Sequence, residues 1–305
     1  MNKSFTLIEI LVVIVVIGVL SAFILIGMSS ITNSANIAKG QAFANSIRNS
    51  LLLNLVSEWK LNGNTNDSWG TNNGTWSGAT APNTVVTYGS ASECVSGQCL
   101  DFDGVDDMVD AGNNSTLSMG TNDHTVSFWV KHDSGDNSYG EYEVYLVCGA
   151  TADGLGQDGY YIARGPGEGF RITFSDGLVS RVQGEPSTNP SLATDKWLHI
   201  VVVFDRDTLA TIYINSILQS STLNISGQAT SVNNTYSYRI GSAASGSLRL
   251  RGKMDEISMY HAAKPSSSIK QEYYFGLNKL FNNNGIGLEE YSQRLVELKN
   301  NLANN

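Results

Sequence analysis

The sequence predicts a mainly β protein, in which an antiparallel sandwich or barrel lies between an N-terminal helical stem and a C-terminal helical hairpin. Three observations lead to this prediction. An almost wholly apolar stretch runs from Phe5 to Met28. Short strand-like runs, divided by Gly, Asn, Asp and Ser, fill the region from Leu55 to His261. After Pro265 the apolar residues return to the spacing of helices.

The chain is acidic and poor in charged residues, which make up 15% of its 305 residues and leave a net charge of −9 at pH 7. Asn, Ser, Thr and Gly are abundant instead, as is typical of an exported β-rich domain with many turns. We expect no nucleic-acid partner, because such a face needs clustered Lys and Arg.

The N-terminal apolar stretch is long enough to cross a membrane. As a helix, residues 5–28 would extend about 36 Å, against about 30 Å for a bilayer core. A secretory signal peptide has a shorter apolar core that is followed by a small-residue cleavage site. A plain membrane anchor explains the apolarity but leaves Glu9 unexplained, since a carboxylate inside a span is costly without a partner.

The run from Lys3 to Glu9, KSFTLIE, resembles the processing site of type IV prepilins. The resemblance implies that a prepilin peptidase removes the leader, residues 1–4, and that the new N-terminus is methylated. The cut would lie between Ser4, where the family usually has Gly, and Phe5. Glu9 would then pair with the free amine of a neighbouring pilin subunit, so that two otherwise unpaired ions neutralise each other.

The helical pattern continues beyond the apolar stretch. Small and apolar residues recur at helical spacing as far as about Leu53, with polar residues between them. This predicts one stem helix over residues 5–54, with its membrane-spanning part at residues 5–28. Pilins are similar, because the second half of their helix packs against the globular head.

The middle of the chain reads as many short strands without helices between them, which indicates an antiparallel sandwich or barrel. Several runs alternate apolar and polar residues, so we expect one buried and one wet face. The runs are residues 84–88, 125–130, 143–147, 159–162, 170–174, 197–204, 209–215 and 253–260.

Motifs follow one another in a specific order in this region: LVSEWKL from Leu55, CLDFDGVDD from Cys99, VSFWV from Val126, WLHIV from Trp197 and GKMDEI from Gly252. This order resembles laminin-G-like, concanavalin A-like domains of bacterial secreted proteins. The resemblance implies a jelly-roll domain over residues 55–263, of a kind that usually binds glycans or proteins. The predicted fold is then an antiparallel jelly-roll sandwich on a long N-terminal α-helical stem.

Two of the three cysteines, Cys94 and Cys99, lie close together around Ser96-Gly97. This spacing predicts a small disulfide loop formed in an oxidising compartment. Cys148 is left over, and we expect it to be a free thiol within a strand.

The laminin-G resemblance also implies a structural calcium ion, held where an Asn/Asp-rich turn after the first strand meets the acidic last strand. The matching positions are Asn62, Asp67, Asn73 and Asp255. Clustered side-chain and backbone oxygens suit this hard cation. The alternative is that these residues only close turns with their own backbone. We interpret a second acidic turn, with Asp103, Asp106 and Asp107, as a tight turn rather than a ligand set.

We expect no enzyme. Glycosidases of this fold family use paired carboxylates on one strand face. Glu141 and Glu143 share a face but lack the surrounding acidic motif, and the neighbours Asp255 and Glu256 should point to opposite faces. The four histidines show no metal-ligand spacing.

The C-terminal tail, residues 266–305, is predicted to be a helical hairpin. One apolar helix face runs from Ile269 to Leu280 and a second from Leu288 to Leu298, with a turn signal at Asn282–Gly285 between them.

The whole chain is therefore interpreted as a subunit of a type IV pilus or related pseudopilus, with a head for adhesion to a glycan or a surface protein. Such a subunit lies in the inner or cytoplasmic membrane before assembly and afterwards at the cell surface or in an extracellular pilus. The alternative is a cell-surface lectin-like binding protein with an uncleaved single-span anchor. Trp69 and Trp76 lie in polar turns and could offer a sugar-stacking face.

Overall fold

The computed structural model describes residues 11, 14, 52, 54–78, 87–133, 142–149, 158–165, 169–177, 182–187, 195–220, 222–243 and 248–303. The chain divides into two units, Met1–Ser50 and Leu51–Asn305. The predicted leader, and all but a few residues of the predicted stem helix, lie outside the described residues. No helix among the described residues is long and apolar enough to span a bilayer.

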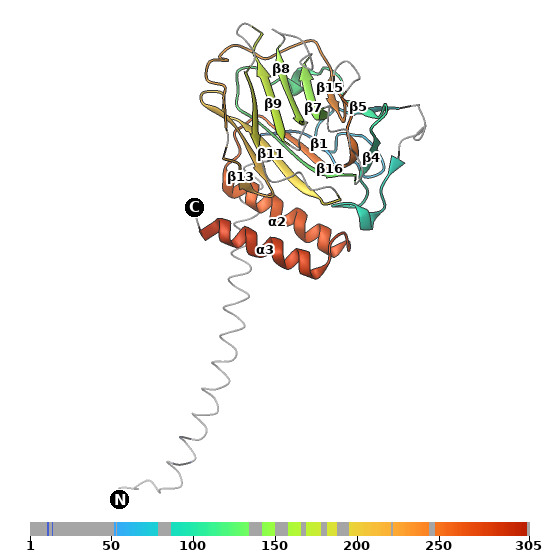
Figure 1. Cartoon of the computed structure of the whole chain (residues 1–305), viewed down its shortest axis with the longest axis vertical. Helices are drawn as coiled ribbons and strands as arrows, with labels where there is room; N and C mark the ends of the chain where they lie inside the picture. Colours follow the sequence, from blue (N-terminus) through green and yellow to red (C-terminus); the bar gives the residue numbers. More distant parts are fainter. Residues whose placement is uncertain are drawn as a thin grey trace, which may run out of the picture. The chain divides into compact units, whose positions relative to one another are not determined.

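Two antiparallel sheets pack face to face in the second unit (Figure 1). The first sheet has the strand order β13-β12-β11-β6-β16-β4-β3, with β1 beside β16 and β14 beside β12. Its strands are β1 (Leu55–Trp59), β3 (Thr87–Tyr88), β4 (Leu100–Asp103), β6 (His124–His132), β11 (Leu198–Phe204), β12 (Leu209–Ile214), β13 (Ile217–Leu218), β14 (Leu223–Asn224) and β16 (Arg251–Tyr260).

The second sheet has the order β10-β9-β8-β7-β15-β5-β2. Its strands are β2 (Thr75–Ser77), β5 (Met108–Asp110), β7 (Glu143–Gly149), β8 (Gly159–Arg164), β9 (Phe170–Ser175), β10 (Val182–Ser187) and β15 (Tyr238–Ile240). Two short 3-10 helices, Ala91–Glu93 and Ser115–Leu117, lie in the loops. The prediction of a mainly β fold with antiparallel sheets and two C-terminal helices is confirmed.

The first and last strands of the sandwich lie side by side. β1 runs antiparallel to β16, with Trp59 opposite Ile257 and Glu58 opposite Ser258. Trp59 is completely buried, and its ring stacks on Tyr238 of the second sheet. The point where the chain enters the sandwich is therefore next to the point where it leaves.

Beneath the C-terminal helices the outer face of the first sheet is buried, whereas the sequence predicted one wet face. All residues of β11 are buried, although only Leu198, Ile200, Val202 and Phe204 join the core between the sheets. On the other side of the strand, Val201 and Val203 pack against Ile269 of the C-terminal helices. A strand that is covered on both faces reads as a continuous apolar run, and β11 has such a sequence.

The cover is the helical hairpin of α2 (Ser266–Asn282) and α3 (Leu288–Ala303), seen beside the first sheet in Figure 1. α2 begins after Pro265, which has no N–H to leave unpaired at the helix start. It ends at a turn in which Asn284 takes a positive φ of 60°. Gly276 allows close packing, because a Cβ there would lie 2.3 Å from the ring of Trp129.

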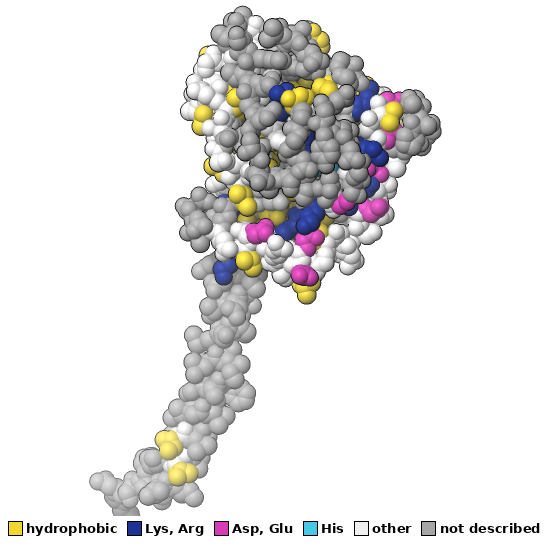
Figure 2. Space-filling view, viewed as in Figure 1, with side chains coloured by type: hydrophobic (Ala, Val, Ile, Leu, Met, Phe, Trp, Pro, Cys, Tyr) yellow, Lys and Arg dark blue, Asp and Glu magenta, His cyan; other side chains and the backbone are white. Residues whose placement is uncertain are grey.

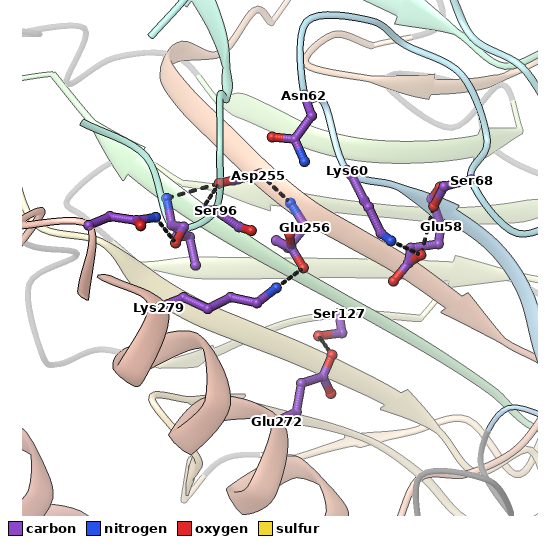
Figure 3. A network of polar contacts seen from close by, with 12 residues as sticks. Glu58, Lys60, Asn62, Ser68, Ser96, Ser127, Asp255, Glu256, Glu272 and Lys279 are labelled. Carbon is purple, nitrogen blue, oxygen red and sulfur yellow. Dashed lines mark hydrogen bonds and ion pairs between the residues drawn. The ribbon is translucent and has the colours of Figure 1, made fainter. Parts of the chain in front are cut away.

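A bulge in β16 changes the direction of one predicted pair. The register of β16 against β6 shifts between Asp255 and Ser258, and Glu256 has a positive φ of 49°. The prediction that Asp255 and Glu256 point to opposite faces is wrong: both reach groups on the outer, hairpin side of the sheet (Figure 3). The extra residue of a bulge breaks the alternation of side chains along a strand.

Candidate functional site

A polar network lies on the outer face of the first sheet, where β1, β16 and α2 meet the loop between β3 and β4. Figure 3 shows Asp255 turned toward Ser96 of that loop and Glu256 turned toward Lys279 of α2. The Lys279 Nζ lies 3.0 Å from the Glu256 carboxylate. The network therefore joins the last strand, the loop and the hairpin.

The loop itself is closed by a disulfide bond between Cys94 and Cys99, with Cα atoms 5.4 Å apart. The predicted pairing is confirmed, and both cysteines are completely buried. We call residues 94–99 the disulfide loop. Cys148 is a free, buried thiol in β7, and burial raises its pKa to about 11. Such a thiol is held in its unreactive, protonated form.

Two of the predicted calcium ligands hold the disulfide loop by hydrogen bonds. The backbone N–H groups of Val95 and Ser96 donate to Oδ2 of Asp255 at 2.9 and 3.0 Å. Oδ1 of Asn62 accepts from the backbone N–H of Gln98 at 2.7 Å. Burial, with the nearby charge of Glu256, raises the pKa of Asp255 well above its usual value.

The other two predicted ligands lie together in the turn after β1. The carboxylate of Asp67 accepts four backbone N–H groups at 2.8–3.0 Å. Asn73 accepts the N–H of Asp67 itself. Burial opposes ionisation of Asp67, but the four hydrogen bonds outweigh it and hold its pKa below the usual value.

The four predicted ligands therefore act in two separate sets of hydrogen bonds, one in the β1 turn and one on the disulfide loop. Every one of them accepts a backbone N–H group. Asp67 and Asn73 close the turn after β1, as in the alternative that the sequence left open, whereas Asn62 and Asp255 hold a loop that is distant in the sequence. Calcium at these positions stays a prediction.

The second acidic turn brings its three carboxylates together. Oxygens of Asp103, Asp106 and Asp107 all lie within 4.8 Å of one another. Asp107 accepts the backbone N–H of Asp103 at 2.9 Å, and Asp103 accepts that of Val105 at 2.8 Å. These bonds agree with the interpretation of a tight turn. The spacing of the aspartates within one turn is the sequence signal for their convergence.

A buried polar cluster joins β6 and β11 to α2. The hydroxyl of Ser127 lies 3.0 Å from Nε2 of His199 and donates to Oε1 of Glu272 at 2.8 Å. Lys264 forms an ion pair with the same carboxylate. Sequence reasoning missed this cluster, because Glu272 lies 145 positions from its partner Ser127.

The cluster resembles a catalytic triad in composition but not in geometry. The carboxylate of Glu272 approaches the same nitrogen of His199 as Ser127 does, at 4.0 Å, whereas a triad acid holds the other nitrogen. Burial lowers the pKa of His199 to about 4. The cluster lies beneath α2, so these residues attach the helix to the sheet.

Three tryptophans are buried in two different places. Trp59 lies between the sheets, but Trp129 and Trp197 lie between the first sheet and the hairpin. Of the two tryptophans expected in polar turns, Trp76 packs partly against the core, and Trp69 is 49% exposed. Only the latter remains a candidate for sugar stacking.

Charges of both signs are mixed on the face of the head that Figure 2 shows, among the described residues. In Figure 2, Lys and Arg side chains lie among Asp and Glu side chains on the visible face and form no patch of one sign. The predicted processing and assembly residues, Ser4, Phe5 and Glu9, lie outside the described residues.

Two family models match the chain. The model of the concanavalin A-like lectin/glucanases superfamily matches residues 103–270, and that of the prokaryotic N-terminal methylation motif matches residues 1–25. No curated protein sequence matches.

Among solved structures, the binding domain of Paraclostridial Mosquitocidal Protein 1 is similar with a TM-score of 0.57 and 17% identity, over 75% of this chain and 53% of that one. The botulinum neurotoxin serotype G binding domain has a TM-score of 0.54 and 16% identity, over 73% of this chain and 51% of that one. The botulinum neurotoxin serotype D ligand-binding domain, in complex with N-acetylneuraminic acid, has a TM-score of 0.57 and 13% identity, over 76% of this chain and 53% of that one.

This chain spans about half the length of these solved structures, and at such identities the likeness concerns the fold. The lectin/glucanase model covers more than half of the chain and includes the strands from β5 to β16. The protein belongs to the concanavalin A-like lectin/glucanase superfamily and carries a prokaryotic N-terminal methylation motif.

Proposed function

We propose that this protein is a type IV pilin-like subunit that displays its concanavalin A-like head outside the cell and binds a glycan or a surface protein. The observation that carries the proposal is the fusion itself, since one chain joins a methylation motif at residues 1–25 to a lectin-type domain at residues 103–270. In this proposal, a prepilin peptidase and other pilin subunits are the partners of the N-terminus.

The N-terminal chemistry of the proposal depends on two charges. Cleavage after Ser4 creates an ammonium at Phe5, and Glu9 supplies a carboxylate within the apolar segment. Each ion alone is costly in an apolar environment, but the two neutralise each other between neighbouring subunits. Before assembly the subunit lies in the inner or cytoplasmic membrane, and it is then incorporated into a filament at the cell surface.

The head gives the proposal its binding function. The superfamily includes lectins, and one of the similar structures, the serotype D domain, holds N-acetylneuraminic acid. A shared fold does not transfer a ligand from one protein to another. We therefore propose only the class of ligand, a glycan or a surface protein.

The mass of the N-terminal peptide from surface-purified protein tests the pilin half of the proposal. We expect a peptide that begins at Phe5 and carries one methyl group. Glu9→Ala should then reduce incorporation into filaments, while Glu289→Ala, which removes an exposed carboxylate of the head, should not. An intact Met1 on surface protein would instead establish the uncleaved, anchored lectin-like protein.

A glycan array probed with the full-length chain in mild detergent tests the binding half. We expect retention on a subset of glycans, and loss of that retention after heat unfolding of the head. If the folded chain binds no glycan, adhesion of cells that carry the filament to purified surface proteins decides between a protein ligand and a head that only spaces the filament.

A further inference from the structure

The disulfide bond is buried beneath the helical hairpin. Cys94 and Cys99 have no exposed surface, and they share an apolar cluster with Tyr273, Leu277 and Leu280 of α2. Leu298 of α3 belongs to the same cluster. Hydrophobic contact with the helical hairpin therefore forms part of the cover over the two sulfur atoms.

The hairpin also binds the disulfide loop through backbone carbonyls. Asn283, which follows α2, donates its side-chain amide to the carbonyl of Val95 at 3.1 Å. Trp197 donates its indole N–H to the carbonyl of Glu93 at 2.9 Å, and its own carbonyl accepts from Arg294 of α3 at 2.9 Å. Asn283 thus binds the disulfide loop directly, and Trp197 connects Arg294 of the hairpin to Glu93, the residue before the loop.

β16 and the turn after β1 also hold the disulfide loop in its closed shape. Asp255 of β16 and Asn62 accept three backbone N–H groups of the disulfide loop. Gly97 turns the loop with a positive φ of 66°. The disulfide bond thus closes a small loop that binds β16 and also contacts the hairpin.

We propose that the helical hairpin and the Cys94–Cys99 bond are thermodynamically linked, so that the docked hairpin shields the bond from thiol reductants and the intact bond stabilises the docked hairpin. A reductant then reaches the sulfur atoms only in the fraction of molecules whose hairpin has opened. The observed rate is the opening equilibrium constant multiplied by the rate for an exposed disulfide.

The chemistry of this step is thiol–disulfide exchange. A thiolate of a small dithiol, such as dithiothreitol, attacks one cysteine sulfur, and the S–S bond breaks as the other cysteine leaves as a thiolate. The second thiol of the reagent then displaces the first cysteine. The reagent becomes a cyclic disulfide, and each cysteine sulfur takes up a proton.

The linkage gives the hairpin a role in maturation. Structural disulfides form in oxidising compartments outside the cytoplasm. A hairpin that docks firmly only on the closed loop completes the head after export. Once docked, it protects the bond from reductants at the cell surface.

The test follows reduction of the full-length chain in mild detergent with excess dithiothreitol, with trapping by a maleimide and mass spectrometry of the Cys94 and Cys99 peptides. Asn283→Ala removes the bond to Val95 and should speed labelling about five-fold. Gly276→Leu should lift α2 from Trp129 and speed labelling more than about ten-fold. The control Val296→Ala, at an exposed position of α3, should stay within about two-fold.

Hydrogen exchange on the same samples separates local opening from global unfolding. Exchange in α2 and α3 should rise by the same factors as labelling, while β8 keeps its protection. Conversely, replacing both Cys94 and Cys99 by Ser should speed exchange in α2 and α3 but not in β8.

Two results would overturn the proposal. In the first, labelling of the bond stays at the wild-type rate although exchange shows that Gly276→Leu has loosened the hairpin. In the second, the variant without the disulfide keeps the wild-type exchange rates in α2 and α3. A variant in which β8 also loses protection is globally destabilised and does not report on local opening of the hairpin. The same comparison of labelling with exchange in Asn283→Ala then decides.

Discussion

The hydrogen bonds of Asp255 lead to a quantitative prediction. Asp255→Ala removes the acceptor of three backbone N–H groups, those of Val95, Ser96 and Glu256. A buried donor left without a partner costs about 1–3 kcal/mol, and a partly buried one costs less because water can reach it. Of the three hydrogen bonds, only that of Val95 is buried on both sides.

A second effect acts in the opposite direction. Burial, together with the charge of Glu256, raises the pKa of Asp255, so the carboxylate itself is costly to keep at neutral pH. Removing it recovers part of the loss. We expect a net decrease of about 3 kcal/mol in the free energy of unfolding, or roughly 6–12 °C in the melting temperature of a domain of this size.

The pH dependence of this group has a definite sign. A raised pKa means that the native state keeps the proton of Asp255 at pH values where the unfolded chain has lost it. The contribution of the group to stability therefore falls as the pH rises above the unfolded value of about 3.9. Asp255→Asn keeps one acceptor and does not titrate, so its deficit against wild type should shrink as the pH rises.

The assay is urea unfolding of the full-length chain in mild detergent at several pH values, followed by tryptophan fluorescence. Glu289→Ala serves as the matched control, because that carboxylate is exposed on α3. A decrease of less than about 1 kcal/mol for Asp255→Ala would show that the loop does not depend on this carboxylate.

Three further predictions concern other parts of the head. If calcium binds the predicted ligands, the melting temperature will rise with the logarithm of the free calcium concentration, and Asp67→Ala will abolish this rise. Equal melting temperatures in calcium and in chelator would mean that these residues only accept backbone hydrogen bonds. Burial lowers the pKa of His199 to about 4 against 6.5 ordinarily, so stability should fall as the pH drops from about 6.5 toward about 4, and His199→Gln should flatten that slope in acid unfolding curves. Gly241→Ala should lower the free energy of unfolding by roughly 3 kcal/mol, because φ is +83° and the new Cβ would lie 2.2 Å from the ring of Phe102. The control Gly227→Ala, where the space around the new Cβ is open, should change the free energy of unfolding little in the same denaturation assay.

The sequence was sufficient for features that depend on local pattern. The alternation of residues in the strands, the helical spacing after Pro265 and the turn before Gly285 each repeat within a few residues, so they predicted the antiparallel sheets and the two helices. The pairing of Cys94 with Cys99 belongs to the same class, because the two cysteines are only 5 positions apart.

The layer between the first sheet and the hairpin is a feature of the tertiary structure alone. An apolar helix face has to be buried, but its sequence does not say against which surface. The sequence therefore predicted the hairpin only as a C-terminal tail, and the structure shows that it packs against Trp129. The bulge at Glu256 likewise depends on how β16 pairs with β6.

The roles of the polar residues were decided in the same way. The sequence singled out Asn62, Asp67, Asn73 and Asp255 because oxygen-rich side chains suit both a cation and a backbone N–H. Asp255 accepts from Val95, which lies 160 positions away, and no local pattern encodes such a contact. The sequence determined which side chains could accept a hydrogen bond or bind a cation. Which backbone N–H groups lie buried beside them depends on how the chain packs, and this decided which donors they hold.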